Sequence, residues 1–262
     1  MNRYEKLIEQ VFYNSYKKGD DSVAFSKDEF EECARTLRID LPKNVPDVIY
    51  SFRHRNPLPD SVRATALDGR EWVIEGTAKG EYKFKLVKVS RIRPNENLAT
   101  IKVPDATPTI VAANAFSDEQ ALLARVRYNR LIDAFLGVVA YSLQNHLRTT
   151  VSGIGQIEID EIYVAIDKNG RQFVLPVQAK GGKDQLGIVQ TSQDISCCQE
   201  KYPSLICRAV SAQFMDDEKI AMFELTIEDD EVKVLQEKHY KLVPADQVTS
   251  EDLKRYENSG ED

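Results

Sequence analysis

The sequence is poor in cysteine, histidine and long apolar segments, and each shortage excludes a class of protein. Its 262 residues include four cysteines, two of them adjacent at Cys197 and Cys198, and three scattered histidines. This spacing argues against a disulfide framework and a zinc site, and it favours a reducing compartment. No apolar run approaches the ~20 residues that span a bilayer, and the N-terminal residues lack the apolar segment of a secretory signal. We therefore expect a cytoplasmic protein that does not enter a membrane.

The net charge of −7 is unevenly distributed along the chain. Residues 1–95 carry 18 Lys/Arg against 15 Asp/Glu, whereas the remaining residues carry 17 against 27. An excess of acidic residues disfavours nucleic-acid binding when charge alone is considered. Metal-dependent nucleases nevertheless need acidic groups, and cations offset them at the site. The net charge therefore does not decide whether the protein binds nucleic acid.

Residues 1–93 have the pattern of a small α+β domain. A capping-box pattern at Ser26-Lys-Asp-Glu29 marks the start of the second of three expected helices. The expected helices lie at residues 4–16, 26–37 and 44–55, and the expected short strands lie at 62–67, 71–75 and 82–89. Three helices followed by a β-hairpin is the order of a winged helix, whose third helix enters the major groove of DNA.

Basic side chains gather on the third expected helix and on the hairpin that follows it. They are Arg53, His54, Arg55, Lys83 and Lys85. On a recognition helix and wing these groups would contact DNA phosphates, whereas on another fold they would form a solvated basic face. Both interpretations stay open.

The rest of the chain predicts a second, larger domain. Residues 94–117 contain three prolines, and we interpret them as a connection between domains with room for one strand. The expected elements that follow are a long buried helix at 117–147, strands at 149–156, 157–166 and 171–180, a helix at 184–201, a strand at 205–213 and a hairpin at 222–235. The order helix, three strands, helix, strand predicts an α/β sandwich with a mixed sheet. The acidic tail 251–262 is expected to be disordered.

The most informative stretch is a predicted hairpin between Glu158 and Lys180. Two β-rich runs flank Asn169-Gly170, a strong hairpin signal. The first run carries Glu158, Asp160 and Glu161, and the second ends in Gln178-Ala179-Lys180. A hairpin gathers these carboxylates, the amide and the ammonium group at one end. Metal-assisted phosphodiester cleavage requires such a set of groups.

The length of the turn decides which carboxylate faces Gln178. A two-residue turn places Glu161 opposite Gln178, whereas a three-residue loop over 168–170 places Asp160 there and Glu158 opposite Lys180. We favour the second register because it leaves two isoleucines, at 157 and 159, for a covered face of the sheet. Asp160 is then the main candidate ligand, and Glu161 is the competing one.

The chemistry of the candidate site follows from these residue types. Mg²⁺ prefers hard oxygen ligands and keeps several waters, so one or two carboxylates are enough. Asp160 would hold the ion, helped by Glu158 or Glu161, and by the Gln178 side-chain oxygen and the Ala179 carbonyl. Lys180 would orient or deprotonate the attacking water and stabilise the developing negative charge. The alternative is a solvated strand edge with no chemical role.

The stretch resembles the PD-(D/E)xK nuclease superfamily, which includes many restriction endonucleases, with Asp160 and Gln178-Ala179-Lys180 in the motif positions. Gln178 stands where the motif usually has Asp or Glu. This Gln-x-Lys variant is similar to that of Mrr-type restriction nucleases, for which the resemblance implies a winged-helix domain ahead of the nuclease domain. The resemblance covers roughly residues 118–215 and implies an αβββαβ sandwich there.

Our hypothesis is a Mg²⁺-dependent restriction-type endonuclease that cleaves double-stranded DNA and uses no organic cofactor. A homodimer is expected because cutting both strands needs two active sites. The predicted organisation is a winged-helix-like domain at 1–93, a linker at 94–117, a nuclease domain at 118–250 and a tail at 251–262. One alternative is a DNA-binding module whose nuclease-like domain is inactive. Another is a modification-dependent or branched-DNA nuclease.

Overall fold

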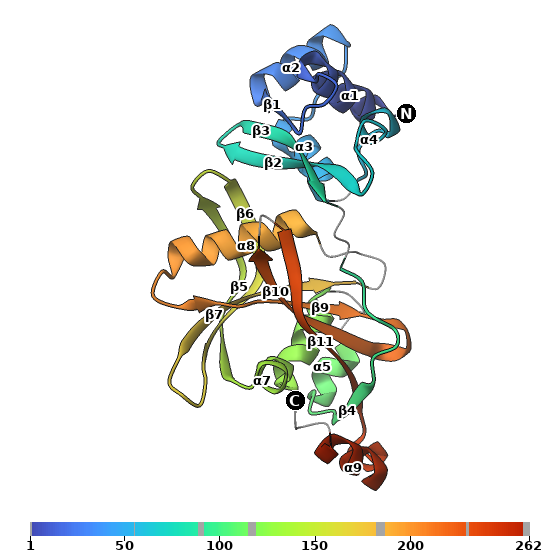
Figure 1. Cartoon of the computed structure of the whole chain (residues 1–262), viewed down its shortest axis with the longest axis vertical. Helices are drawn as coiled ribbons and strands as arrows, with labels where there is room; N and C mark the ends of the chain where they lie inside the picture. Colours follow the sequence, from blue (N-terminus) through green and yellow to red (C-terminus); the bar gives the residue numbers. More distant parts are fainter. Residues whose placement is uncertain are drawn as a thin grey trace. The chain divides into compact units, whose positions relative to one another are not determined.

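The computed structural model describes residues 2–54, 56–88, 92–114, 119–181, 187–228 and 231–258 (Figure 1). The chain divides into two compact units. The first comprises Met1–Ser90 with Thr149–Ile157, and the second comprises Arg91–Arg148 with Glu158–Asp262. Among the helices in the described ranges, none is both long enough and apolar enough to cross a bilayer.

The first unit combines helices with a three-stranded antiparallel sheet in the order β1-β3-β2. Its core joins the helices to the sheet through fully buried side chains such as Leu7, Phe12, Phe30 and Phe84. The expected capping box is present, because the Ser26 side chain accepts the Glu29 N–H at 3.1 Å. The elements are α1 (Arg3–Ser15), β1 (Ser22–Ser26), α2 (Lys27–Thr36), α3 (Val45–His54), α4 (Asp60–Arg63), β2 (Arg70–Ala78) and β3 (Glu81–Lys88).

Two local predictions for the first unit were wrong. The start of the expected strand at 62–67 lies in the short helix α4, where Val62 is fully buried. Pro59 caps the N-terminus of α4 and Asp60 is its first residue, and an acid in the first turn stabilises a helix. Strand β1 was not predicted because its five residues bury only Val23 and Phe25, which is too short a pattern to identify a period.

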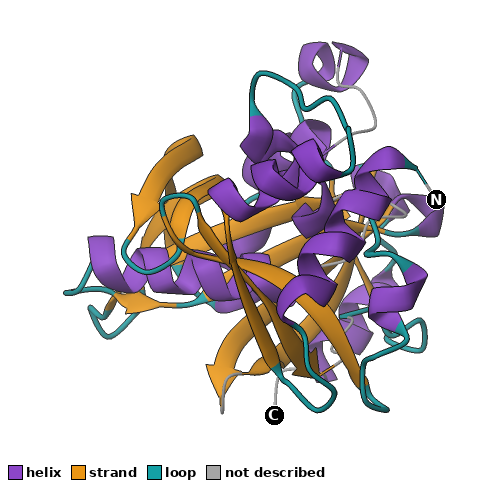
Figure 2. Cartoon of the chain, turned by 90° about the horizontal axis from the view of Figure 1, so that it is seen from above, coloured by secondary structure: helices purple, strands orange, loops and turns teal. Residues whose placement is uncertain are grey.

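The second unit is a mixed α/β structure built on an eight-stranded mixed sheet. The strand order is β4-β11-β10-β9-β7-β6-β5, with β8 paired to β7. The strands fan out from one another, as in a twisted sheet (Figure 2). The elements are β4 (Thr100–Pro104), α5 (Thr109–Asn114), α6 (Glu119–Tyr128), α7 (Leu131–Leu136), β5 (Val139–Val151), β6 (Gly155–Ile166), β7 (Gln172–Lys180), α8 (Ile188–Lys201), β8 (Ile206–Cys207), β9 (Ala209–Phe214), η1 (Asp216–Glu218), β10 (Lys219–Glu228), β11 (Glu231–Val243), η2 (Ala245–Gln247) and α9 (Ser250–Asn258).

Helices cover both faces of this sheet. Helices α6 and α7 pack on one face, where Leu122 and Phe135 belong to the same core as Val177 of β7. Helix α8 packs on the other face, where Ile195 meets Phe223 of β10. Alternate residues of one strand therefore face different helices.

The expected long helix over 117–147 is wrong beyond residue 136. Arg130, with a left-handed φ of 50°, separates α6 from α7, and Gly137, with a φ of 66°, ends α7. A glycine in this conformation is a common helix stop. Val139 and Leu143, which fall within the expected buried helix, instead lie exposed on β5. The expected cap residue Ser117 lies outside the described residues.

The expected linker at 94–117 contains structure that belongs to the second unit. Strand β4 pairs in parallel with β11, so it forms the end of the large sheet opposite β5, and α5 follows it. The segment therefore contains the one strand that was expected, but this strand is part of the second unit and not of a free connection between domains.

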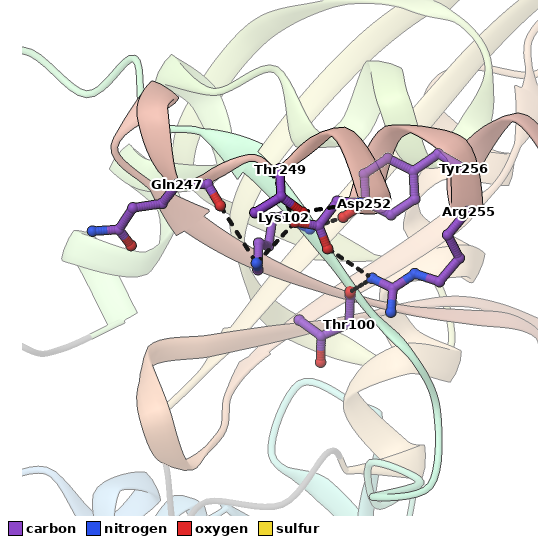
Figure 3. A network of polar contacts seen from close by, with 7 residues as sticks. All are labelled: Thr100, Lys102, Gln247, Thr249, Asp252, Arg255 and Tyr256. Carbon is purple, nitrogen blue, oxygen red and sulfur yellow. Dashed lines mark hydrogen bonds and ion pairs between the residues drawn. The ribbon is translucent and has the colours of Figure 1, made fainter.

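The expected disordered tail is largely the helix α9, which docks on β4 through polar contacts (Figure 3). The Asp252 carboxylate accepts from Lys102 Nζ at 2.9 Å and from the Thr249 N–H at 3.0 Å. The Tyr256 hydroxyl accepts the Lys102 backbone N–H at 2.8 Å. The sequence conceals this contact because charged and polar groups make it, with little apolar periodicity to indicate it.

Asp252→Asn should loosen α9. The Lys102 and Thr249 hydrogen bonds lower the pKa of Asp252, so its carboxylate stabilises the fold above the unfolded-state pKa, and this stabilisation is lost as the pH falls through the lowered folded-state value. The substitution removes it at neutral pH as well. Hydrogen–deuterium exchange over residues 250–258 should become faster, whereas Glu251→Gln should leave it unchanged. Unaltered exchange in Asp252→Asn would contradict the role of this contact.

Candidate functional site

The hairpin of β6 and β7 turns through a three-residue loop. The Asp167 side chain accepts the backbone N–H groups of Asn169 and Arg171, both at 2.9 Å, and the Gly170 N–H binds the Asp167 carbonyl at 3.0 Å. Gly170 has a φ of 79°, a conformation that few residues other than glycine adopt. A turn that ends in a left-handed glycine is the common form of the three-residue hairpin loop.

This loop sets the register that the sequence analysis favoured. Glu161 pairs with Val177, and the same register continued along the strands places Asp160 opposite Gln178 and Glu158 opposite Lys180. Consistent with this, Asp160 Oδ2 accepts the Ala179 N–H at 2.9 Å. Ala179 thus contacts Asp160 through its backbone N–H group, and the predicted role of its carbonyl as a ligand stays a prediction.

Three of the predicted residues lie together with an aspartate of α8. Gln178 is 3% exposed, and its Nε2 donates to Asp194 Oδ2 at 2.5 Å. The charge of Lys180 acts on both Asp160 and Asp194. We call Asp160, Gln178, Lys180 and Asp194 the hairpin cluster. It occupies the face of the sheet that α8 covers.

The two carboxyl groups of the hairpin cluster both have raised pKa values. Burial raises the pKa of Asp160, against the opposing effect of the Ala179 N–H and the Lys180 ammonium group. Burial raises the pKa of Asp194 far more, and the charge of Asp160 adds to that rise. A bound cation would offset both the burial and the mutual repulsion of these groups.

The donor set of the hairpin cluster fits Mg²⁺. Gln178 Oε1 and Asp194 Oδ1 are buried and have no hydrogen-bond partner among the described residues. Together with the Asp160 carboxylate they are hard oxygen donors. Within the described ranges, no group of three or more His, Cys, Asp or Glu side chains could hold a metal ion. A site that uses one or two carboxylates, an amide oxygen and several waters needs no such group.

Glu161, the competing ligand, does not join the hairpin cluster. Its carboxylate is fully buried on the opposite face of the sheet, where Oε1 accepts from Arg127 Nε of α6 at 2.9 Å and from the Ser142 hydroxyl of β5 at 2.5 Å. Adjacent strand residues point to opposite faces, so only one of Asp160 and Glu161 can face α8. The structure thus gives Glu161 partners on α6 and β5 and does not bring it together with Asp160, Gln178 and Lys180.

Glu158 shares the strand face of Asp160, but its carboxylate contacts the side chains of Arg148 and His146 on β5. Arg148 Nε lies 3.1 Å from Glu158 Oε2, and His146 Nδ1 lies 3.4 Å from Oε1. Its predicted role as a helper ligand would require these contacts to open.

Several of the predicted DNA-binding side chains are paired with an acidic residue or buried. Lys83 and Lys85 of β3 both pair with Glu75 of β2, at 3.3 Å and 3.8 Å. In Arg53, Nε and Nη2 are buried and have no hydrogen-bond partner among the described residues, and burial lowers the pKa of the side chain. Arg55 and the side chain of His54 lie outside the described residues.

Asp194 is the residue that the sequence analysis missed. It lies on α8 beside Thr191, Ile195 and Cys198, which are buried at helical spacing. A carboxylate on the buried face of a helix needs a polar or charged partner. The position of Asp194 among apolar residues at helical spacing was therefore the sequence feature that could have identified it. The helix was predicted, but Asp194 was not separated from its polar neighbours.

Asp194→Asn should make the protein more stable at neutral pH. The raised pKa means that the folded state holds the Asp194 proton more tightly than the unfolded state, so stability falls as pH rises between the two pKa values. Asparagine keeps an acceptor for Gln178 without the buried charge. Urea unfolding at acidic and neutral pH should show a flatter profile for the variant, and exposed Asp216→Asn should match the wild type. A less stable variant at neutral pH would contradict this assignment.

Comparison of the chain with protein-family models, with curated proteins and with solved structures finds no match in any of the three. The functional inference therefore rests on the geometry of the hairpin cluster.

Proposed function

We propose that the protein is a Mg²⁺-dependent endonuclease of PD-(D/E)xK type that cleaves double-stranded DNA. The observation that carries the proposal is the meeting of Asp160, Gln178 and Lys180 on one face of the β6–β7 hairpin, with Asp194 of α8 beside them. Oxygen donors for a hard cation next to a lysine are the groups that phosphodiester hydrolysis needs.

The order of elements supports the same proposal. In the second unit, α6 and α7 precede β5, β6 and β7, and α8 leads to β9, which pairs in parallel with β7. This agrees with the αβββαβ order that the sequence resemblance implies. In the first unit, helices α1, α2 and α3 precede the β2–β3 hairpin, as expected for a winged-helix-like reader of DNA.

Each residue of the hairpin cluster has a task in the proposed reaction. Asp160 and the unpartnered oxygens of Gln178 and Asp194 would hold Mg²⁺, which when bound lowers the pKa of a water and offsets charge on the phosphate. The Asp194–Gln178 hydrogen bond fixes the amide so that Oε1, rather than Nε2, is available to the ion.

Lys180 ends strand β7. Its side chain is only 15% exposed, and its ammonium group lies 3.5 Å from Glu119 Oε1 at the start of α6. It orients the attacking water and stabilises the negative charge that develops on the phosphate. Because one such site cuts one strand, we expect two copies of the chain to act together on a duplex.

A plasmid assay tests the proposal. The purified full-length chain with supercoiled plasmid and Mg²⁺ should produce linear DNA, and EDTA should prevent the cut. Methylated and unmethylated plasmids compared in parallel would reveal a modification requirement. Salt-sensitive DNA binding without cleavage under any divalent metal would replace the proposal with an inactive DNA-binding module.

A further inference from the structure

Arg148 and His146 of β5 both contact the carboxylate of Glu158, next to the hairpin cluster. Arg148 makes two contacts with Glu158, Nε to Oε2 at 3.1 Å and Nη2 to Oε1 at 3.4 Å, and His146 Nδ1 lies 3.4 Å from Oε1. The side chains of Arg148 and His146 are 70% and 51% exposed, whereas that of Glu158 is 30% exposed. Arg148 and His146 are therefore more exposed to solvent than the carboxylate of Glu158 that they contact.

The position of this group relates it to the proposed reaction. Glu158 and Asp160 are two residues apart on β6, so they share a face and lie roughly 7 Å apart along the strand. A protonated His146 would lower the pKa of Asp160. Within the described residues, strand β5 is the last strand at its end of the sheet.

We propose that Arg148 and His146 bind phosphate groups of the DNA backbone beside the scissile phosphate, and that Glu158 holds them in place until DNA arrives. This inference rests on the proposed nuclease function. A phosphate offers the guanidinium group the same two-oxygen geometry as a carboxylate. Exposed ion pairs contribute little to stability, so exchanging Glu158 for a phosphate costs little.

The exchange has a consequence for Glu158. Once Arg148 and His146 have moved to phosphate, the Glu158 carboxylate is free beside Asp160. It then joins the oxygen donors of the cluster only when DNA is bound. This explains why a residue on the face of Asp160 is occupied by cationic side chains in the free protein.

The hairpin offers a matched control at its other end. Arg171 Nε pairs with Asp167 Oδ2 at 2.6 Å, and the Arg171 side chain is 63% exposed. Asp167 is seven residues from Asp160, or roughly 20 Å along the strand. Arg171→Ala and Asp167→Asn therefore remove the same charges as Arg148→Ala and Glu158→Gln, far from the cluster.

The test measures DNA binding by the full-length chain in EDTA, where no cleavage occurs, as anisotropy of a labelled duplex over a range of KCl concentrations. Arg148→Ala should weaken binding and reduce the slope of log K against log[KCl] by about 1, the share of one phosphate contact. His146→Asn, chosen because asparagine tolerates the φ of 48° at this position, should also weaken binding. Glu158→Gln should tighten binding more than Asp167→Asn does.

The outcomes separate this inference from the proposed function. Wild-type slope in Arg148→Ala, or an equal loss in Arg171→Ala, would overturn the phosphate contact. Equal gains in Glu158→Gln and Asp167→Asn would overturn the holding role of Glu158. A wild-type protein that cuts plasmid while Arg148→Ala binds DNA as tightly would leave the nuclease proposal intact and reject only this inference. A wild-type protein that does not bind duplex DNA would reject both.

Discussion

Asp160→Asn should lower the rate of DNA cleavage by about 10³-fold while leaving the fold and DNA binding unchanged. Asparagine has the shape of aspartate and still accepts the Ala179 N–H, so the hairpin geometry is kept. It lacks the negative charge that holds the cation, and groups that stabilise charge in a transition state contribute about 10²–10³-fold each. Single-turnover cleavage with Mg²⁺, together with duplex binding in EDTA, measures both effects.

Lys180→Met belongs to the same prediction, because it removes the ammonium group that stabilises the phosphate charge. Its matched control is Lys168→Met, since Lys168 is exposed in the hairpin loop at the far end of the same strands. The control should cut DNA at the wild-type rate. Wild-type rates in both Asp160→Asn and Lys180→Met would refute the assignment of the site.

Arg127→Ala should lower the free energy of unfolding by about 1–3 kcal/mol, because it leaves the buried Glu161 carboxylate without its cationic partner, although the Arg127 side chain is itself 35% exposed. Glu161 is fully buried, and its Oε2 has no hydrogen-bond partner among the described residues. Without Arg127, only the Ser142 hydroxyl would remain on Oε1 to offset the charge. Urea denaturation monitored by circular dichroism measures the loss.

The double variant supplies the control for this prediction. Glu161→Gln alone should cost less than Arg127→Ala, because an amide oxygen still accepts from Arg127 and Ser142. Adding Glu161→Gln to Arg127→Ala should recover part of the lost stability by removing the buried charge. Glu161→Gln should also cleave DNA within about tenfold of the wild-type rate, unlike Asp160→Asn. A strongly impaired but stable Glu161→Gln protein would instead return Glu161 to the catalytic role.

The hairpin and its register could be predicted from the sequence because local physics determines them. Glycine at position 170 allows the left-handed conformation, and Asp167 has the short side chain that closes the loop onto Asn169 and Arg171. The choice between Asp160 and Glu161 followed from the apolar residues on the other face. The most informative stretch of the chain was therefore also the most predictable one.

The parts that the sequence did not predict depend on contacts between distant segments. Val139 and Leu143 were taken as a helix face, but Gly137 ends the helix before them, and only the pairing with β6 makes the segment a strand. Helix α9 is ordered by Asp252 and Lys102, which are 150 residues apart. The contact of Asp194 with the hairpin depends on the packing of α8, which brings its carboxylate to the Gln178 side chain.

The most direct test of the account is anomalous diffraction from crystals of the full-length protein soaked in Mn²⁺, which substitutes for Mg²⁺ at oxygen sites. The account predicts a peak about 2.1–2.2 Å from an Asp160 oxygen and from Gln178 Oε1 or Asp194 Oδ1. Asp160→Asn crystals should lack that peak. A hairpin cluster without any peak, or a peak bound by Glu161 on the opposite face, would contradict the central claim that these side chains hold the cation.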